Sequence, residues 1–587
     1  MNKLFRIYLD EFDRQASYFT DEIVSGIENG SLKKVSTDCI NAINALAPLH
    51  RNALISRAMR MAGIRGTEKY TVKMLEEKVF KTEFVESLSD IINVIQARVS
   101  DFWLSALDET EIHAIAKSYA RHEFSKNSWP SNEKFKLTEI TSEQKRASDI
   151  AHQKRSLRRR ASTARQALSA LLATVGHKTT AYADAFTLAC WRERQESARA
   201  YGQNRLLTWT DATGKTKSVS LFDVIETSRK SRFATLYAQT VGLDELTVRR
   251  DLIPIFITIT LPPQYHANPQ FGQPFGGNGI EDCPLPTETD QALASLWVRF
   301  RARASARKIN LLGLRVIEAH QDGCPHLHAL LYVKRDQVQT LDGFLTALRP
   351  EPVPGLRVAT KLEILDRARG KPASYVIKYL IKTLPAREQA NKLADGTCDE
   401  NGDPDHLAHH DEVRAWASER RLRQFAWIGI HGLRAPWQRL HQADEAELEQ
   451  APSSIKEAHS ALRNGQWGDA LEALGAIKSD KKVRPKISYV ESKNRYGEII
   501  KKPFSLTLED WSIKLKRYTY EIVRVMKDIT KQRIHVFKKE EIAGLTVIVS
   551  YPSSAVLEDS ACKTIERTGP PPALEQNNDA EMQFINI

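Results

Sequence analysis

Cysteine is scarce in this sequence, and its placement excludes two classes of stabilised scaffold. The 587 residues contain six cysteines, none of which stand in the paired spacing of a disulfide framework or a zinc ribbon: Cys39, Cys190, Cys283, Cys324, Cys398 and Cys562. Isolated cysteines of this kind are typical of a protein in a reducing compartment. Cys324 precedes a histidine-rich stretch, but nothing in its spacing makes it a metal ligand.

Long apolar runs are also missing. No stretch of about 18 apolar residues occurs in the chain, so no membrane-spanning helix is expected. The first dozen residues, MNKLFRIYLDEF, carry charges throughout, which excludes a secretory signal peptide at this end. The sequence therefore predicts a cytoplasmic protein.

A complete phosphate-binding loop of the Gly-x-x-x-x-Gly-Lys-Ser/Thr type is absent as well. Gly214-Lys215-Thr216 ends like such a loop, but Trp209 stands where its first glycine belongs. We therefore do not expect the chain to hydrolyse ATP through this kind of loop.

Positive charge, in contrast, is plentiful. Lysine and arginine number 85 against 73 acidic residues, a net charge of +12 with a pI near 9.2. This balance favours a polyanionic partner, although charge alone does not separate nucleic acid from an acidic membrane surface. The length exceeds what one hydrophobic core supports and suggests about three or four domains.

The stretch LRVIEAHQDGCPHLHALLYV, from Leu314 to Val333, predicts a β-hairpin that could hold a metal. Its two strands alternate with a period of two, and Asp322-Gly323 supplies the turn. His326 and His328 fall on one face of the second strand, and Glu318 lies near the end of the first. Two imidazoles and a carboxylate can chelate one divalent cation and leave positions open for water or phosphate oxygen. Chance alone gives about 0.4 His-x-His pairs in such a chain, so the prediction depends on this surrounding pattern.

A second motif follows downstream, in SYVIKYLIK from Ser374 to Lys382. On a helix Tyr375 and Tyr379 lie on one face, with Lys378 and Lys382 beside them. Tyrosines at this spacing are commonly core or rim aromatics. Next to a metal site, however, they are suited to act as nucleophiles, because nearby lysines favour the phenolate form.

Together these motifs resemble those of the HUH endonucleases, and among them the bacteriophage replication gene A protein family of rolling-circle initiators. Three motifs carry the resemblance in order: the strand 256–262 (FITITLP), Pro325-His326-Leu327-His328 with Glu318 upstream, and Tyr375-x-x-Lys378-Tyr379. A later segment, from Ala415 to Phe425, is also similar. The resemblance covers roughly residues 190–437.

The resemblance implies a site- and strand-specific nicking-joining enzyme. Glu318, His326 and His328 would bind Mg²⁺ or Mn²⁺, and Tyr375 and Tyr379 would be the nucleophiles, assisted by Lys378. The product would be a 5′-phosphotyrosine link with a free 3′-OH, and rejoining would close the displaced strand. The implied partners are origin DNA with a single-stranded nick site in a supercoiled duplex, and a host helicase and DNA polymerase in the bacterial cytoplasm. Two alternatives remain open: an HUH transposase or conjugative relaxase, and a non-enzymatic DNA-binding regulator.

The expected fold class is α+β, with an antiparallel sheet of five or so strands flanked by helices. We expect a helical region over 1–185, a connector over 186–250 with a hairpin around 211–214, and the nicking-joining domain over 251–440. An accessory region over 441–567 would include a helix over 506–529, and a disordered tail would follow over 568–587. A loop over 390–413 holds His406, His409 and His410, for which solvation is more plausible than a second metal site. The basic helix 145–165 is either a solvated face or a surface that tracks DNA phosphates.

Overall fold

A computed structural model describes residues 37–61, 82–127, 141–176, 179–210, 214–270, 272–348, 360–376, 409–480, 482–515, 521–528, 533–537, 541–542 and 545–547. The fold mixes helices with antiparallel sheets, which confirms the predicted α+β class. None of the described helices is long and apolar enough to cross a membrane.

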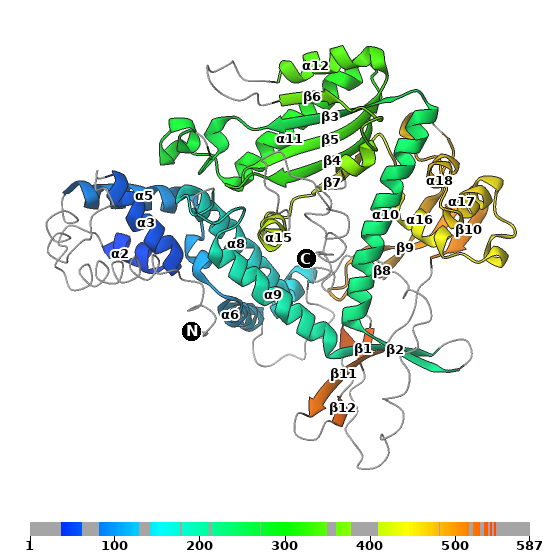
Figure 1. The fold of residues 1–587 in the computed structure, drawn as a ribbon. Helices are drawn as coiled ribbons and strands as arrows, with labels where there is room; N and C mark the ends of the chain where they lie inside the picture. Colours follow the sequence, from blue (N-terminus) through cyan, green and yellow to red (C-terminus); the bar gives the residue numbers. More distant parts are fainter. Residues whose placement is uncertain are drawn as a thin grey trace.

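A five-stranded antiparallel sheet in the order β6-β3-β5-β4-β7 lies at the top of the view in Figure 1 and is called the central sheet because its strands come from the middle of the sequence. Its strands are β3 (Ile253–Thr260), β4 (Leu312–Ala319), β5 (Pro325–Val333), β6 (Thr360–Ile364) and β7 (Phe425–Ile428). The predicted hairpin is confirmed as β4 and β5. Gly323 in its turn has a φ of 79°, a left-handed conformation that glycine adopts without strain. The Asp322 carboxylate accepts a hydrogen bond from the Cys324 amide at 3.1 Å and stabilises the same turn.

The two faces of the sheet pack against different helices. The face carrying Ile257, Leu327 and Leu331 is covered by α11 (Pro286–Ala306) and α12 (Val338–Thr346), as the alternation in the sequence predicted. The opposite face carries Phe256, Leu314 and Leu330. It joins a second core with α10 (Leu221–Arg249), α16 (Arg434–His441), α17 (Ser453–Arg463) and α18 (Trp467–Ala473). The metal-binding candidates lie on this second face.

The described elements between residues 37 and 203 are helices, as predicted: α2 (Thr37–Asn44), α3 (Pro48–Met61), α5 (Thr82–Arg98), η2 (Phe102–Ala106), α6 (Glu109–Asn127), α7 (Ser142–Ala147), α8 (Ile150–Leu171) and α9 (Ala185–Gln203). The predicted basic helix corresponds to α7 and α8. Figure 1 shows α8 and α9 crossing below the central sheet, with α15 (His410–Arg420) between them and the strands.

The predicted connector hairpin is confirmed as β1 (Arg205–Thr210) and β2 (Thr216–Ser220), which pair antiparallel. The long helix α10 follows and runs from this hairpin to the central sheet (Figure 1). Short 3₁₀ turns complete the described part: η4 (Pro263–Tyr265), η5 (Pro274–Gly277), η6 (Ile280–Asp282), η7 (Arg335–Gln337), η8 (Glu445–Leu448) and η9 (Lys478–Asp480).

The prediction of a helix over 506–529 is wrong, because the described residues of this region form strands. The described strands of the C-terminal part are β8 (Lys486–Lys493), β9 (Ile499–Leu508), β10 (Trp511–Lys514), β11 (Glu521–Asp528), β12 (Arg533–Phe537), β13 (Glu541–Ile542) and β14 (Leu545–Val547). Leu506 and Leu508 are buried in β9, and Ile513 is buried in the neighbouring β10. This period of two belongs to a strand, and a turn at Glu509, with a φ of 53°, separates the two strands. The predicted tail over 568–587 lies outside the described residues.

The loop predicted over 390–413 is also wrong at its end. Helix α15 begins at His410, with Asp411 and Glu412 in its first turn, where negative charge stabilises a helix. His410 is buried beside Asp411, and the His409 ring contacts that of Tyr182. His406 lies outside the described residues.

A buried ion-pair cluster joins α8 and α9 of the helical region to α15. Glu419 of α15 pairs with Arg194 of α9, and its other oxygen lies 3.9 Å from Arg165 of α8. All three side chains are less than a tenth exposed. Removing one partner of such a buried ion pair destabilises the fold, because the remaining charge is then buried without a counter-charge.

Replacing Glu419 by alanine should therefore lower the free energy of unfolding by about 3 kcal/mol or more, because Arg165 is left buried without its carboxylate. The midpoint of urea unfolding, followed by circular dichroism, measures this loss. Glu196→Ala, an exposed glutamate on α9, is the matched control and should leave the midpoint within experimental error. Equal midpoints for the two variants would contradict a structural role for the cluster.

Candidate metal centre

The hairpin brings Glu318, His326 and His328 onto one face of the sheet. Glu318 stands opposite His326 in the register of β4 and β5, and Val316 stands opposite His328. Opposed residues of antiparallel strands share a face, so the carboxylate and both rings point the same way. The Nε2 atoms of both histidines lie 3.7 Å from Oε2 of Glu318. The structure thus brings the three predicted residues together.

These donors fit a divalent cation. All three side chains are buried, and their ligand atoms lie within 4.8 Å of one another. The 3.7 Å separations exceed the length of a hydrogen bond and suit donors that surround one ion at about 2.1 Å each. Imidazole and carboxylate ligands in this number would leave coordination positions open. Among the described residues this is the one group of three or more potential ligands gathered in this way.

Strand β3 orients the histidine closest to the core. Thr258 stands opposite His328, and its Oγ1 lies 3.0 Å from the His328 Nδ1. When Nε2 binds a metal, Nδ1–H donates to this hydroxyl and fixes both the tautomer and the ring orientation. The ring of Phe256 stacks on His328 at 5.3 Å between centroids. The sequence predicts the strand that carries Thr258 but not this hydrogen bond.

Thr258→Val should weaken Mn²⁺ binding by roughly 10-fold or more, since the valine keeps the volume but removes the acceptor that orients His328. Isothermal titration calorimetry of the full chain measures the affinity directly. Thr260→Val makes the same change on the same face of β3, and no side-chain hydrogen bond of Thr260 is found among the described residues. An equal loss in both variants would mean that the hydrogen bond has no specific role.

A second histidine cluster, which sequence analysis missed, lies behind His326. The ring of His320 lies 4.2 Å from that of His326 and 5.1 Å from that of His266, measured between centroids. The His266 Nδ1 donates to the Asp322 carboxylate at 3.0 Å. His320 follows Glu318 by two residues, just past the end of β4. This spacing of two is the sequence feature that could have identified His320 as a neighbour of the site.

Burial and neighbouring polar groups together determine which histidines of this cluster are protonated. It opposes protonation of His266, but the Cys324 sulfur and the Asp322 carboxylate outweigh it and raise the pKa of His266 to about 11. Burial and the charge on His266 lower the pKa of His320 to about 4. A charged His266–Asp322 pair therefore stabilises the turn, and a neutral His320 packs against His326. Cys324 is buried in this cluster.

The first tyrosine of the predicted pair lies close to the metal centre. Residues 372–376 are helical, and the Tyr375 ring meets Phe256 edge-on at 4.8 Å between centroids. Since Phe256 also stacks on His328, a single ring separates Tyr375 from a histidine of the candidate metal centre. Lys378, Tyr379 and Lys382 lie outside the described residues.

A comparison with known proteins identifies a family whose model matches this chain. A model of the bacteriophage replication gene A protein family (GPA) matches residues 52–387, more than half of the chain. The match contains the metal centre and Tyr375. It begins earlier than the resemblance seen in the sequence, and the 415–425 segment lies beyond it. No solved structure matches the chain.

Individual relatives are phage proteins. The chain is 25% identical over 337 residues to the "Probable replication protein P12" of Pseudoalteromonas phage PM2, covering 56% of this chain and 51% of that protein. It is 26% identical over 355 residues to the "Replication gene A protein" of Escherichia phage 186, covering 58% and 49%. A "Probable replication endonuclease from prophage-like region 1" of Salmonella typhi is 26% identical over 226 residues, covering 37% and 27%. The chain thus spans about half the length of the first two relatives. Its match to the family model over more than half its length shows that it belongs to the bacteriophage replication gene A protein family.

Proposed function

We propose that this chain nicks and rejoins one DNA strand at a replication origin and thereby initiates rolling-circle replication. The observation that carries the proposal is the placement of Tyr375 one ring away from a buried His-His-Glu group. A metal site next to a tyrosine suits transesterification, whereas a hydrolytic nuclease needs no tyrosine. The name "replication endonuclease" carried by several relatives supports the same chemistry.

In this proposal the tyrosine oxygen attacks the scissile phosphorus. A P–O bond to tyrosine forms as the P–O3′ bond breaks, the phenol gives up its proton, and the departing O3′ takes one up. The products are a 5′-phosphotyrosine and a free 3′-OH that can prime synthesis. No water is consumed, so the phosphotyrosine link keeps the energy of the broken bond for rejoining.

The side chains around the site hold the reacting groups in place. Glu318, His326 and His328 would hold Mg²⁺ or Mn²⁺, which when bound polarises a phosphate oxygen as a Lewis acid. Phe256 packs between His328 and Tyr375 and fixes the distance from the nucleophile to the metal-binding residues. Lys378, three residues after Tyr375 in the sequence, is proposed to stabilise the phenolate and the charge that develops on phosphorus.

The test is a covalent adduct. The full chain is incubated with Mn²⁺ and labelled single-stranded fragments that tile the replicon encoding it, and denaturing gels reveal protein-linked DNA. An adduct on the 5′ side of one cut, in one fragment and one strand, is expected. Cleavage that leaves a free 5′-phosphate would indicate hydrolysis, and binding without cleavage would indicate a non-enzymatic regulator. Cleavage at the ends of a mobile element in place of an origin would favour a transposase or relaxase.

We further propose that a separate host helicase and polymerase extend the nick. The basis is the incomplete phosphate-binding loop, in which Trp209 replaces the first glycine. The purified chain with ATP should leave a nicked origin duplex unseparated, as followed by strand displacement on native gels. ATP-driven unwinding by the chain alone would refute this division of work.

A further inference from the structure

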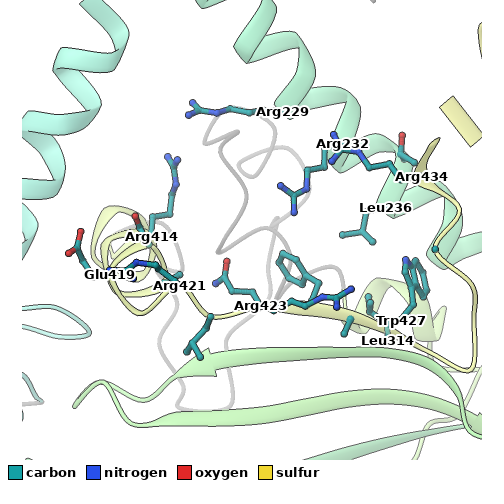
Figure 2. Close-up of a pocket in the computed structure, with 18 of the residues that line it drawn as sticks. Arg229, Arg232, Leu236, Leu314, Arg414, Glu419, Arg421, Arg423, Trp427 and Arg434 are labelled. Atoms are coloured by element: carbon teal, nitrogen blue, oxygen red, sulfur yellow. The ribbon is translucent and has the colours of Figure 1, made fainter. Parts of the chain in front are cut away.

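An arginine-lined cavity lies on the same face of the sheet as the metal centre. It has a volume of about 750 Å³ and is bounded by α8, α10, α15, β7 and the segment after β7. Figure 2 shows six of its arginines converging on one space: Arg229, Arg232, Arg414, Arg421, Arg423 and Arg434. Strand β7 supplies the half-buried rings of Phe425 and Trp427 at its floor.

The register of the sheet connects this cavity with the metal centre. Phe425 stands opposite Val316 on β4, and Val316 stands opposite His328 on β5. All three therefore occupy one cross-strand row on one face. Two strand spacings separate Phe425 from His328, about 10 Å between backbones. A polymer bound at the metal centre would reach the cavity within a few of its units.

The positive charge of the cavity is largely uncompensated. Within the part of the chain that the structure describes, no carboxylate lies within ion-pair distance of Arg232, Arg423 or Arg434. Glu419 also lines the cavity, but Arg165 and Arg194 neutralise it. Burial and the nearby Arg229 lower the pKa of Arg414 to about 10, so it keeps its charge at neutral pH. Such crowding of like charges is relieved when an anion enters.

We propose that this cavity binds the single-stranded DNA that flanks the scissile phosphate, with arginines on its phosphates and Phe425 and Trp427 against its bases. The assignment deepens the proposed function and rests on it. Arginine and aromatic side chains in one groove are the combination that binds single strands, since a duplex hides the faces of its bases. A cavity of this volume accommodates a few nucleotides of one strand but not a double helix.

The test measures binding of a short fluorescent oligo-dT by anisotropy, in EDTA and at several salt concentrations. The variant Arg232→Gln/Arg434→Gln should bind about 10-fold or more weakly at low salt. It should also lower the slope of log affinity against log salt by about 1.4, since each single-strand phosphate contact contributes about 0.7. The control Arg299→Gln/Arg307→Gln removes the same charge from exposed positions at α11, which covers the other face of the sheet, and should match the parent. Arg232→Lys/Arg434→Lys should restore most of the slope, which excludes misfolding as the cause.

Equal affinities and slopes for the cavity variant and its control would overturn the proposal. So would an equal loss of binding to a duplex of the same length, because the site would then not select single strands. Photocrosslinked oligo-dT should map to the peptide that contains Phe425 and Trp427. The measurement needs no cleavage, so a chain that forms no covalent adduct but binds oligo-dT here would refute the nicking function and leave the cavity assignment standing.

Discussion

His326→Ala or His328→Ala should abolish DNA nicking while leaving the chain folded and able to bind DNA. Each change removes one of the three buried side chains proposed to hold the ion, and polarisation of the phosphate contributes several kcal/mol to such a reaction. We therefore expect the nicking rate to fall by roughly 10³-fold or more. Gel assays of plasmid nicking in Mg²⁺ and in Mn²⁺ measure the loss. Glu318→Ala should weaken metal affinity more than it harms the fold, because its carboxylate is one donor among three.

Several controls keep this prediction specific. His113→Ala changes an exposed histidine on α6 and should nick at the parental rate. Calorimetry with Mn²⁺ should show weakened binding in the two metal-site variants, and circular dichroism should show an unchanged fold. Parental cleavage by either variant in both metals would eliminate the metal assignment.

The clustering of Glu318, His326 and His328 could be predicted from sequence because its determinants are local. A period of two placed His326 and His328 on one strand face, and the Asp322-Gly323 turn fixed which residue of β4 stands opposite them. The Thr258 hydrogen bond could not be found in this way. It depends on β3 pairing with β5, a contact between segments about 70 residues apart whose register no local pattern specifies.

The basic stretch 145–165 shows that the roles of charged side chains also depend on partners that are distant in the sequence. Both alternatives for residues 145–165 treated its arginines as available to solvent or DNA. In the structure Arg158 donates two hydrogen bonds to Glu109, and Arg160 pairs with Asp101. Arg155, Arg158 and Arg159 line the arginine cavity. Acidic partners about 50 residues away therefore hold some arginines of one basic stretch in ion pairs and leave others without a carboxylate among the described residues, and composition alone carries no information about that difference.

The second large effect concerns the tyrosine pair Tyr375 and Tyr379. Tyr375→Phe/Tyr379→Phe should leave no nicking, whereas either substitution alone should leave some single-round nicking. Phenylalanine keeps the ring of Tyr375 against Phe256 and removes the nucleophilic oxygen, so packing is preserved. Single-turnover cleavage of an origin oligonucleotide measures each variant. Tyr489→Phe, an exposed tyrosine on β8, is the matched control.

Two tyrosines are expected because one round of replication requires two cuts. In the proposed mechanism the first tyrosine opens the origin and stays linked to the 5′ end, so a second tyrosine would have to cut the regenerated origin. That cut forms a second phosphotyrosine and frees a 3′-OH, which attacks the first phosphotyrosine, restores a phosphodiester and closes the displaced circle. The sequence predicts that residues 375 and 379 share a helix, on which they would stand one turn apart, about 6 Å along the axis, and could reach one phosphate site in alternation. Peptide mapping after many rounds should find DNA adducts on both residues. Adducts confined to one tyrosine would show that the other only packs and that the enzyme cuts with a single nucleophile.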